Sequence, residues 1–311
     1  MSTTTGPVHY DPYDFELNRA PYETYRRLRD EQPLFYNEQH DFYALSRFDD
    51  VEEGLRDPTT YSSSRGNIVE MIKMGFDMPS GVLIYEDPPV HSIHRRLMSR
   101  VFTPKKMAAL EERIRLECAR CLDPFVGSAE LDVVGGLGAV VPMHTIGMLL
   151  GIPEVDQRSL RDRPEADMRT KDGEPMAVTA SFASGTAFAE YVDWRTRHPS
   201  DDLMTMLIET EFEDEHGVTR RLTRPEILTY VNVIAGAGNE TTTHLIGWAA
   251  KVLADHPDQR RQLVEDPSLI PNAIEELLRR FPDWSVLDDR AAMSPSSTVR
   301  GWASLPIDLT A

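Results

Sequence analysis

The chain has 311 residues, of which 33 are Lys or Arg and 51 are Asp or Glu, so its formal net charge is −18. This acidity excludes non-specific nucleic-acid binding, which requires an excess of basic side chains. The 41% hydrophobic content excludes a wholly disordered chain, and two cysteines exclude a disulfide scaffold and favour a reducing compartment.

The most apolar stretch, residues 131–152, lacks the roughly 20 uninterrupted apolar residues of a membrane span. Asp132, Pro142 and His144 interrupt it. The N-terminus has neither the basic start nor the apolar run of a signal peptide. We therefore expect a cytoplasmic globular protein.

The first 90 residues predict short elements and one long loop. Helical spacing follows Pro21 and ends at Pro33. Two aromatic runs within 35–45 flank a polar tetrapeptide, which predicts a hairpin, and a capped helix is expected from about 50 to 57. Residues 59–90 are rich in Ser, Gly and Pro and predict a long loop, which in proteins is often a lid or binding loop.

The middle of the chain predicts further helices, at about 91–101, 105–122, 140–150, 155–163, 176–197 and 201–210. In the second of these helices an apolar stripe ends in Cys118 and Cys121, which predicts buried core thiols. The charged segment 211–221 is expected to be solvated.

The best-defined helix begins near Thr223, where Thr223-Arg-Pro-Glu226 fits a capping box. Its pattern continues to Ala254, about 46 Å at 1.5 Å per residue. A last helix is expected at 272–280. Strand signals are few, so we expect a mainly α protein with a small β portion.

The centre of the long helix, Ala235–Thr243, has poor helix chemistry, because glycines and adjacent threonines disfavour the helix. Gly238 and Thr242 share one face, as do Ala237 and Thr241. Two interpretations stay open. The small residues allow close helix packing, or they accommodate a flat ligand beside which Glu240 and Thr241 handle protons.

Three segments resemble motifs of one known family. Ala237–Thr242 resembles the central-helix motif of cytochromes P450. Residues 272–279 resemble the family's later Glu-x-x-Arg helix, and 87–104 resemble the segment that holds the heme propionates in bacterial members. The motifs occur in family order, and the resemblance covers nearly all of residues 10–280. It implies a cytochrome P450-type fold.

The resemblance also implies site residues, a cofactor and partners. The implied cofactor is heme b. The implied reactants are O2 and a small apolar substrate, and the implied electron donor is a ferredoxin or a flavin-dependent reductase. Proton delivery is implied for Glu240, Thr241 and Thr242, and an ion-pair network for Glu276 and Arg279. The implied heme-binding residues are His91, Arg95, Ala237, Gly238 and Arg290. The implied substrate lid, 66–82, includes Ile68, Val69, Ile72 and Val82.

Residues 91–115 carry seven Lys or Arg against two Glu, a basic stretch in an acidic chain. A local basic patch can steer an acidic electron donor. The alternative is a helix with an ordinary basic outer face.

The chain departs from the family pattern at the iron ligand. P450 iron requires a cysteine thiolate, and the family's cysteine loop is absent after the Glu-x-x-Arg segment. Cys118 and Cys121 do not match its position, so no metal ligand is assigned. We therefore expect a single P450-like domain, 1–311, without its C-terminal part, with 281–311 as a divergent or frameshifted tail and with impaired activity.

Two other functions are weighed. A non-catalytic heme- or ligand-binding remnant would keep the fold without turnover. A Mg²⁺-dependent all-α isoprenoid synthase would use the acidic run Asp49–Glu53, but a second metal motif is missing from the sequence.

Overall fold

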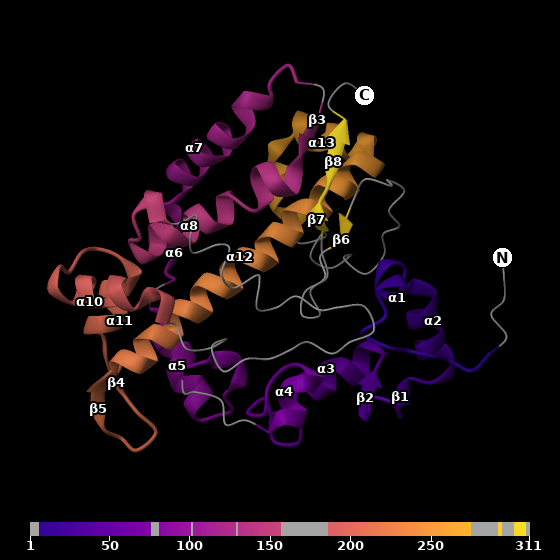
Figure 1. The fold of residues 1–311 in the computed structure, drawn as a ribbon, viewed down its shortest axis with the longest axis horizontal. Helices are drawn as coiled ribbons and strands as arrows, with labels where there is room; N and C mark the ends of the chain where they lie inside the picture. The colour runs from indigo at the N-terminus through magenta and orange to yellow at the C-terminus, as the bar shows by residue number, and fades with distance from the viewer. Residues whose placement is uncertain are drawn as a thin grey trace.

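The computed structural model describes residues 6–75, 81–100, 102–128, 130–156, 186–274, 292–293 and 302–308. One long helix, α12 (Arg224–Asp255), runs diagonally through the molecule with the other elements arranged around it (Figure 1). Most described elements are helices, and the strands among them form only two-stranded sheets. The prediction of a mainly α fold with a small β portion is confirmed.

The N-terminal elements lie together at the lower right of Figure 1. They are α1 (Phe15–Arg19), α2 (Tyr22–Glu31), β1 (Leu34–Asn37), β2 (Phe42–Leu45) and α3 (Phe48–Arg56). The predicted hairpin is confirmed, because β1 and β2 pair antiparallel with Phe35 opposite Ala44. Phe35 also joins Val8 and Leu28 in a small buried cluster, which fixes the hairpin to α2.

The prediction of one long loop over 59–90 is wrong in part. This segment contains a helix, α4 (Val69–Met74), and a 3-10 turn, η1 (Leu83–Tyr85). Met71 of α4 is only 2% exposed, so burial of one apolar face stabilises a helix that is too short to form on its own. The next helix, α5 (Val90–Ser99), begins directly after the proline pair at 88–89.

The single helix predicted over 105–122 is divided into α6 (Pro104–Ala108) and α7 (Glu111–Leu122). At the division the Leu110 amide donates to the Met107 carbonyl three residues back, at 3.1 Å, so the chain turns more tightly than an α-helix.

The middle of the chain supplies elements that pack on α12. They are the π-helical turn η3 (Val134–Gly138), α8 (Val141–Leu150), η5 (Thr186–Phe188), α10 (Ala189–Arg197) and α11 (Leu203–Glu209). Two further elements, η2 (Asp123–Phe125) and β3 (Glu130–Asp132), pack against α7 and η3 respectively. The main core lies between α8, α10, α11 and the first half of α12. Leu150, Leu207 and Val231 are completely buried there. The predicted helices at 140–150 and 201–210 are confirmed, whereas most of 155–163 and the first part of 176–197 lie outside the described residues.

Most of the charged segment 211–221 is exposed, as predicted, but β4 (Glu211–Glu213) and β5 (Thr219–Arg221) also form an antiparallel hairpin that the sequence did not predict. Phe212 is buried and the guanidinium of Arg220 lies 4.7 Å from its ring centroid. Arg220 also forms an ion pair with Glu226 at 2.9 Å. One buried aromatic residue therefore holds a charged segment against the start of α12.

The capping box of α12 is confirmed. Glu226 Oε2 accepts from the Thr223 amide at 2.7 Å, and Thr223 Oγ1 accepts from the Glu226 amide at 3.4 Å. The helix then continues without interruption through its glycines and threonines for 32 residues, about 48 Å.

The described elements after α12 are α13 (Pro257–Glu265), η6 (Pro267–Leu269), β6 (Ala292–Met293), β7 (Trp302–Ser304) and β8 (Pro306–Asp308). β8 pairs antiparallel with β3, and Leu305 beside it is 2% exposed, so this part of the tail packs against the folded chain. The helix predicted at 272–280 lies mostly outside the described residues. Among the described helices, none has the length and apolar content needed to cross a membrane.

Candidate active site

One strip of the central motif is open. Gly236, Ala237, Glu240 and Thr241 lie on one face of α12, where Ala237 and Thr241 are exposed and the other two are half-buried. A methyl group added at Gly236 would meet no atom within 4 Å. We call these four residues the open strip. It combines space, a hydroxyl group and a carboxylate, as the ligand interpretation of the motif requires.

Gly238 lies on a different face, toward α8. A methyl group added there would overlap Ile146 Cδ1, so glycine at this position allows the two helices to approach closely. The structure thus contains both arrangements that the sequence allowed. Close packing occurs at Gly238, and an accessible surface lies at the open strip.

The three consecutive threonines have different surroundings. The Thr241 hydroxyl donates to the Ala237 carbonyl at 2.7 Å, which leaves its lone pairs available on the open side. Thr242 is exposed. Thr243 is buried, and its hydroxyl lies 2.7 Å from the Gly138 carbonyl and 2.9 Å from the Asn239 carbonyl, so this residue joins α12 to η3.

The predicted lid lies next to the open strip. Met71, Val82 and Tyr85 form a buried group, the lid cluster, against which Ile68 and Val233 pack. Val233 precedes Ala237 by one helical turn on the same face of α12. Of the other two predicted lid residues, Val69 is half-buried and Ile72 is 52% exposed.

Both ends of the lid require glycine. Gly66 has a φ of +115°, and a methyl group there would overlap Met71 Cβ, while Gly81 has a φ of +100° and lies against the Tyr230 ring. An L side chain is strained at such φ values.

The predicted heme-propionate residues lie on α5. His91 is half-buried and Arg95 is exposed. In the part of the chain that the structure describes, no carboxylate forms an ion pair with Arg95, so its guanidinium is available to an added anion. On the buried side of α5, the His94 ring contacts the Tyr230 ring at 5.8 Å. Tyr230 lies 11 residues before Thr241, about 16 Å along α12.

Hydrogen bonds fix the beginning of α5. Asp87 accepts from the Ser62 hydroxyl at 2.5 Å and from the Ser63 amide at 3.0 Å. These bonds, with a smaller contribution from His91, lower the pKa of Asp87. The loop after α3 is therefore attached to the helix that carries His91 and Arg95.

Three predicted residues, Glu276, Arg279 and Arg290, lie outside the described residues, and their roles stay predictions.

The residues present fit heme in part. The open strip suits the face of the group. Arg95, which has no carboxylate partner among the described residues, suits a propionate. Cys118 and Cys121 lie on α7, which packs against α8 and η3 at a distance from the lid (Figure 1). They are half-buried, not fully buried as predicted, because Glu117 of α7 occupies the buried position and its Oε1 lies 2.5 Å from His144 Nδ1. Neither cysteine is placed to be an axial ligand at the open strip.

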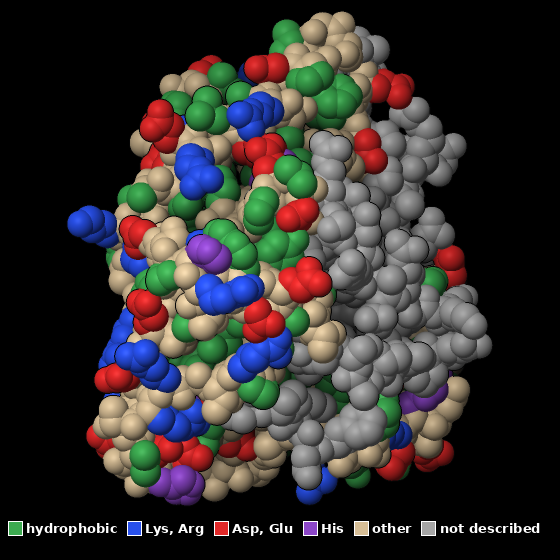
Figure 2. Space-filling view, turned by 60° about the vertical axis from the view of Figure 1, so that its left-hand side comes forward, with side chains coloured by type: hydrophobic (Ala, Val, Ile, Leu, Met, Phe, Trp, Pro, Cys, Tyr) green, Lys and Arg blue, Asp and Glu red, His purple; other side chains and the backbone are tan. Residues whose placement is uncertain are grey.

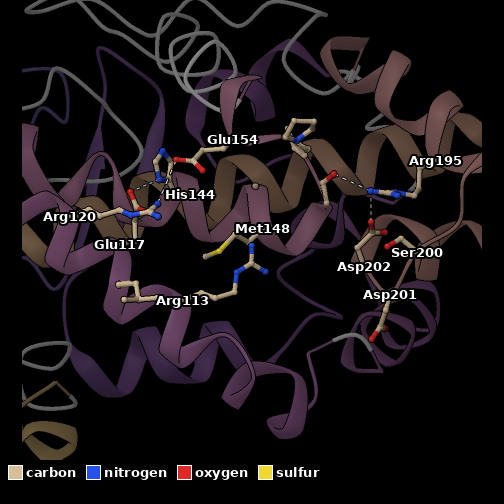
Figure 3. A pocket seen from close by; sticks show the side chains of 15 residues that line it. Arg113, Glu117, Arg120, His144, Met148, Glu154, Arg195, Ser200, Asp201 and Asp202 are labelled. Atoms are coloured by element: carbon tan, nitrogen blue, oxygen red, sulfur yellow. Dashed lines mark hydrogen bonds and ion pairs between the residues drawn. The ribbon is translucent and has the colours of Figure 1, made fainter.

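A cavity of about 610 Å³ lies elsewhere, between α7, α8 and the start of α11 (Figure 3). None of the predicted site residues lines it. Its carboxylates are largely paired within the chain, Glu117 with His144 and Arg120, and Asp202 with Arg195 at 2.6 Å. Because these charges satisfy one another, the cavity offers few free polar groups to a ligand.

Glu86, between the lid and α5, and His94, on α5, form a pair that the sequence did not single out. Glu86 follows the lid, and both its carboxylate oxygens lie within 2.9 Å of His94 Nδ1. His94 is three residues after His91 in the sequence, and burial distinguishes the two. Its helical spacing to Leu97 and Met98 could have predicted that burial, but not its pairing with Glu86.

The metal site required by a Mg²⁺-dependent synthase is not found in the described chain. Asp49 and Asp50 lie in the exposed first turn of α3. Among the described residues, no three His, Cys, Asp or Glu side chains converge on one point.

Comparisons with known proteins identify the class. No family model matches the chain. Cytochrome P450 123 of Mycobacterium tuberculosis is 34% identical over 275 residues, which cover 86% of this chain and 67% of that protein. Vitamin D(3) 25-hydroxylase of Pseudonocardia autotrophica is 31% identical, covering 89% of this chain and 68% of that protein. The ligand-free structure of cytochrome P450 TbtJ1 has a TM-score of 0.70 and 33% identity, covering 84% of this chain and 66% of the other.

The chain belongs to the cytochrome P450 family, a family of heme monooxygenases. It spans about two thirds of the length of the relatives that it matches.

Proposed function

We propose that the open strip, the lid cluster and α5 together form the heme and substrate site of a cytochrome P450 monooxygenase. The observation that carries this proposal is the open strip itself. Its small residues lie within about one turn of Val233, which packs against the lid cluster, and the Glu240 carboxylate and the Thr241 hydroxyl lie a further turn along α12. When bound, heme would supply the iron at which O2 is activated.

The roles of the residues follow from their chemistry. His91 and Arg95 would bind the propionates, since charge-assisted hydrogen bonds to carboxylates are strong and Arg can form two at once. Thr241 would hold a proton-bearing water on the open side, and Glu240 would exchange protons with it. Ala237 leaves room for these groups beside the bound cofactor. The predicted role of Thr242 is not supported in the same way, because Thr242 shares a helix face with Gly238 and not with the open strip.

A second candidate function is heme binding without turnover. It is favoured by the position of the two cysteines, because the thiolate that supports O–O cleavage in this family cannot come from α7. We propose that the 311-residue chain binds heme more readily than it hydroxylates a substrate.

The proposed substrate is a small apolar molecule of the steroid or terpenoid class. Met71 and Val82 are buried and Ile68 packs against them, so the part of the lid that borders α12 is apolar. The related hydroxylase of Pseudonocardia autotrophica is named for vitamin D(3), which is an apolar molecule of this kind.

The proposed electron donor is a ferredoxin or flavin-dependent reductase that docks at the basic stretch. Figure 2 brings forward the left-hand side of Figure 1, and on this face Lys and Arg side chains are interspersed with Asp and Glu. Arg115 forms an ion pair with Glu111 at 2.8 Å, so part of the positive charge is neutralised within the chain. Arg96 and Arg100 are exposed and have no carboxylate partner among the described residues.

Arg96→Glu with Arg100→Glu tests the donor surface. Ferredoxin affinity is expected to fall about tenfold at low salt, and the difference is expected to shrink as salt screens the charges. Arg26→Glu on the distant helix α2 is the control. Equal ferredoxin binding by wild type and the double variant at every ionic strength would contradict the proposed surface.

Titration of the chain with hemin, followed by its Soret absorption, tests the proposed site. Arg95→Ala is expected to weaken hemin binding about tenfold, equivalent to about 1.4 kcal/mol, because one charge-assisted contact is lost. Arg96→Ala, the neighbouring exposed residue, is the matched control. Equal hemin affinity for both variants and wild type would show that α5 does not hold the propionates.

A further inference from the structure

Glu86 makes contacts on two sides of its carboxylate. Oε1 accepts from the Gly81 amide at 2.7 Å, and the two oxygens lie 2.9 and 2.8 Å from His94 Nδ1. Gly81 is the last glycine of the lid, and His94 is on α5. One carboxylate therefore joins the end of the lid to the helix that carries His91 and Arg95.

The pair is buried from both directions. The side chains of His94 and Glu86 are only 2% and 8% exposed. The His94 ring makes edge contacts with Phe212 at 6.0 Å and with Tyr230 at 5.8 Å. A buried carboxylate is stable only when its partners satisfy it, so Glu86 has little freedom to leave His94 and Gly81.

The backbone at Gly81 has little freedom as well. A methyl group there would lie 3.3 Å from Tyr230 Cε2, and its φ of +100° suits glycine alone. Gly81 therefore lies between the Glu86 carboxylate and the Tyr230 ring. A displacement of α5 that moves His94 must move Glu86, and with it the end of the lid.

We propose that Glu86 and His94 are positioning residues that couple the end of the lid at Gly81 to α5. A displacement at Gly81 would thereby be transmitted to the helix that carries His91 and Arg95, and binding at those residues would steady Gly81. The effect of this coupling on heme binding rests on the proposed function. The coupling itself is a property of the protein without heme, and coupling between two sites is reciprocal.

Residue-resolved amide hydrogen exchange of the heme-free protein tests the coupling. His94→Leu is expected to raise exchange at the Gly81 amide at least tenfold, although the substitution is on α5 and leaves the acceptor Glu86 in place. Without its partner, the buried carboxylate turns toward water and releases that amide. Ser99→Ala, an exposed residue on the same helix, is the control and is expected to leave Gly81 unchanged. Exchange at Gly81 within twofold of wild type in His94→Leu would overturn the proposal.

The double variant Glu86→Leu with His94→Leu removes both polar groups together and so leaves no unpaired buried charge. It keeps the test decisive if His94→Leu does not fold. Hemin is expected to slow exchange at Gly81 in wild type but not in the double variant, while it slows exchange in α5 in both proteins. Equal slowing at Gly81 in both would overturn the coupling. Failure of wild type to bind hemin would refute the proposed function alone, because the heme-free experiment stands without it.

Discussion

At the scale of single residues, the candidate site is defined by which neighbours in one motif are open and which are buried. Thr241 is exposed while Thr243, two residues later, joins α12 to η3 through the Gly138 carbonyl. The motif predicted that small residues and hydroxyls share a helix face. Which glycine faces α8 and which faces open space could not be predicted, because that depends on Ile146, far away in the sequence.

His244 gives a pH-dependent prediction. It is 5% exposed, and burial lowers its pKa from 6.5 to about 4. Because the folded pKa lies below the unfolded one, the unfolded chain gains its proton first as the pH falls. His244 therefore reduces the free energy of unfolding between about pH 6.5 and pH 4, by roughly 3 kcal/mol in total.

His244→Leu should remove this loss. Urea unfolding at pH 7 and pH 4 is expected to show that the variant gains roughly 3 kcal/mol relative to wild type on acidification. His216→Gln, an exposed histidine with 76% of its side chain accessible, is the control and should follow wild type. Parallel pH profiles for His244→Leu and wild type would contradict the assigned burial.

At the scale of elements, local sequence signals predicted where a helix begins more accurately than they predicted how elements pack together. The capping box placed the start of α12 within one residue, because the cap forms between neighbours in the sequence. The β4–β5 hairpin was missed, since its strands are short and charged and only Phe212 is buried. Glu86 and His94 were missed as a pair because their burial depends on Phe212 and Tyr230, which come much later in the chain.

Gly236 and Gly238 offer a matched pair of substitutions in α12. Gly236→Ala is expected to raise the free energy of unfolding by up to about 1 kcal/mol, since alanine is the better helix former and its methyl group meets nothing. Gly238→Ala is expected to lose this gain and lower stability by about 1 kcal/mol, because the methyl group overlaps Ile146 Cδ1. Urea unfolding of both variants measures the difference.

Ile146→Val supplies the control, because it removes the Cδ1 atom. Combined with Gly238→Ala it should recover part of the lost stability, whereas with Gly236→Ala the effects should add. If Gly238→Ala stabilises the protein as much as Gly236→Ala does, α8 and α12 are not packed as described.

At the scale of the whole molecule, membership of the P450 family and the position of the cysteines point in different directions. The proposed heme site consists of the open strip, the lid cluster and α5. The only two cysteines of the 311 residues lie on α7, and burial raises the pKa of both thiols, which disfavours the thiolate that iron needs. The sequence alone predicted this conflict, because the family motifs and the cysteine positions can be compared without a structure.

The reduced-CO difference spectrum of the hemin-loaded chain tests this conflict most directly. We predict that the chain binds hemin, that the reduced-CO form lacks the thiolate-type Soret band, and that Cys118→Ala with Cys121→Ala leaves the spectrum unchanged. A thiolate-type band that disappears in this double variant would contradict the placement of α7 and the proposal that the chain binds heme without its thiolate.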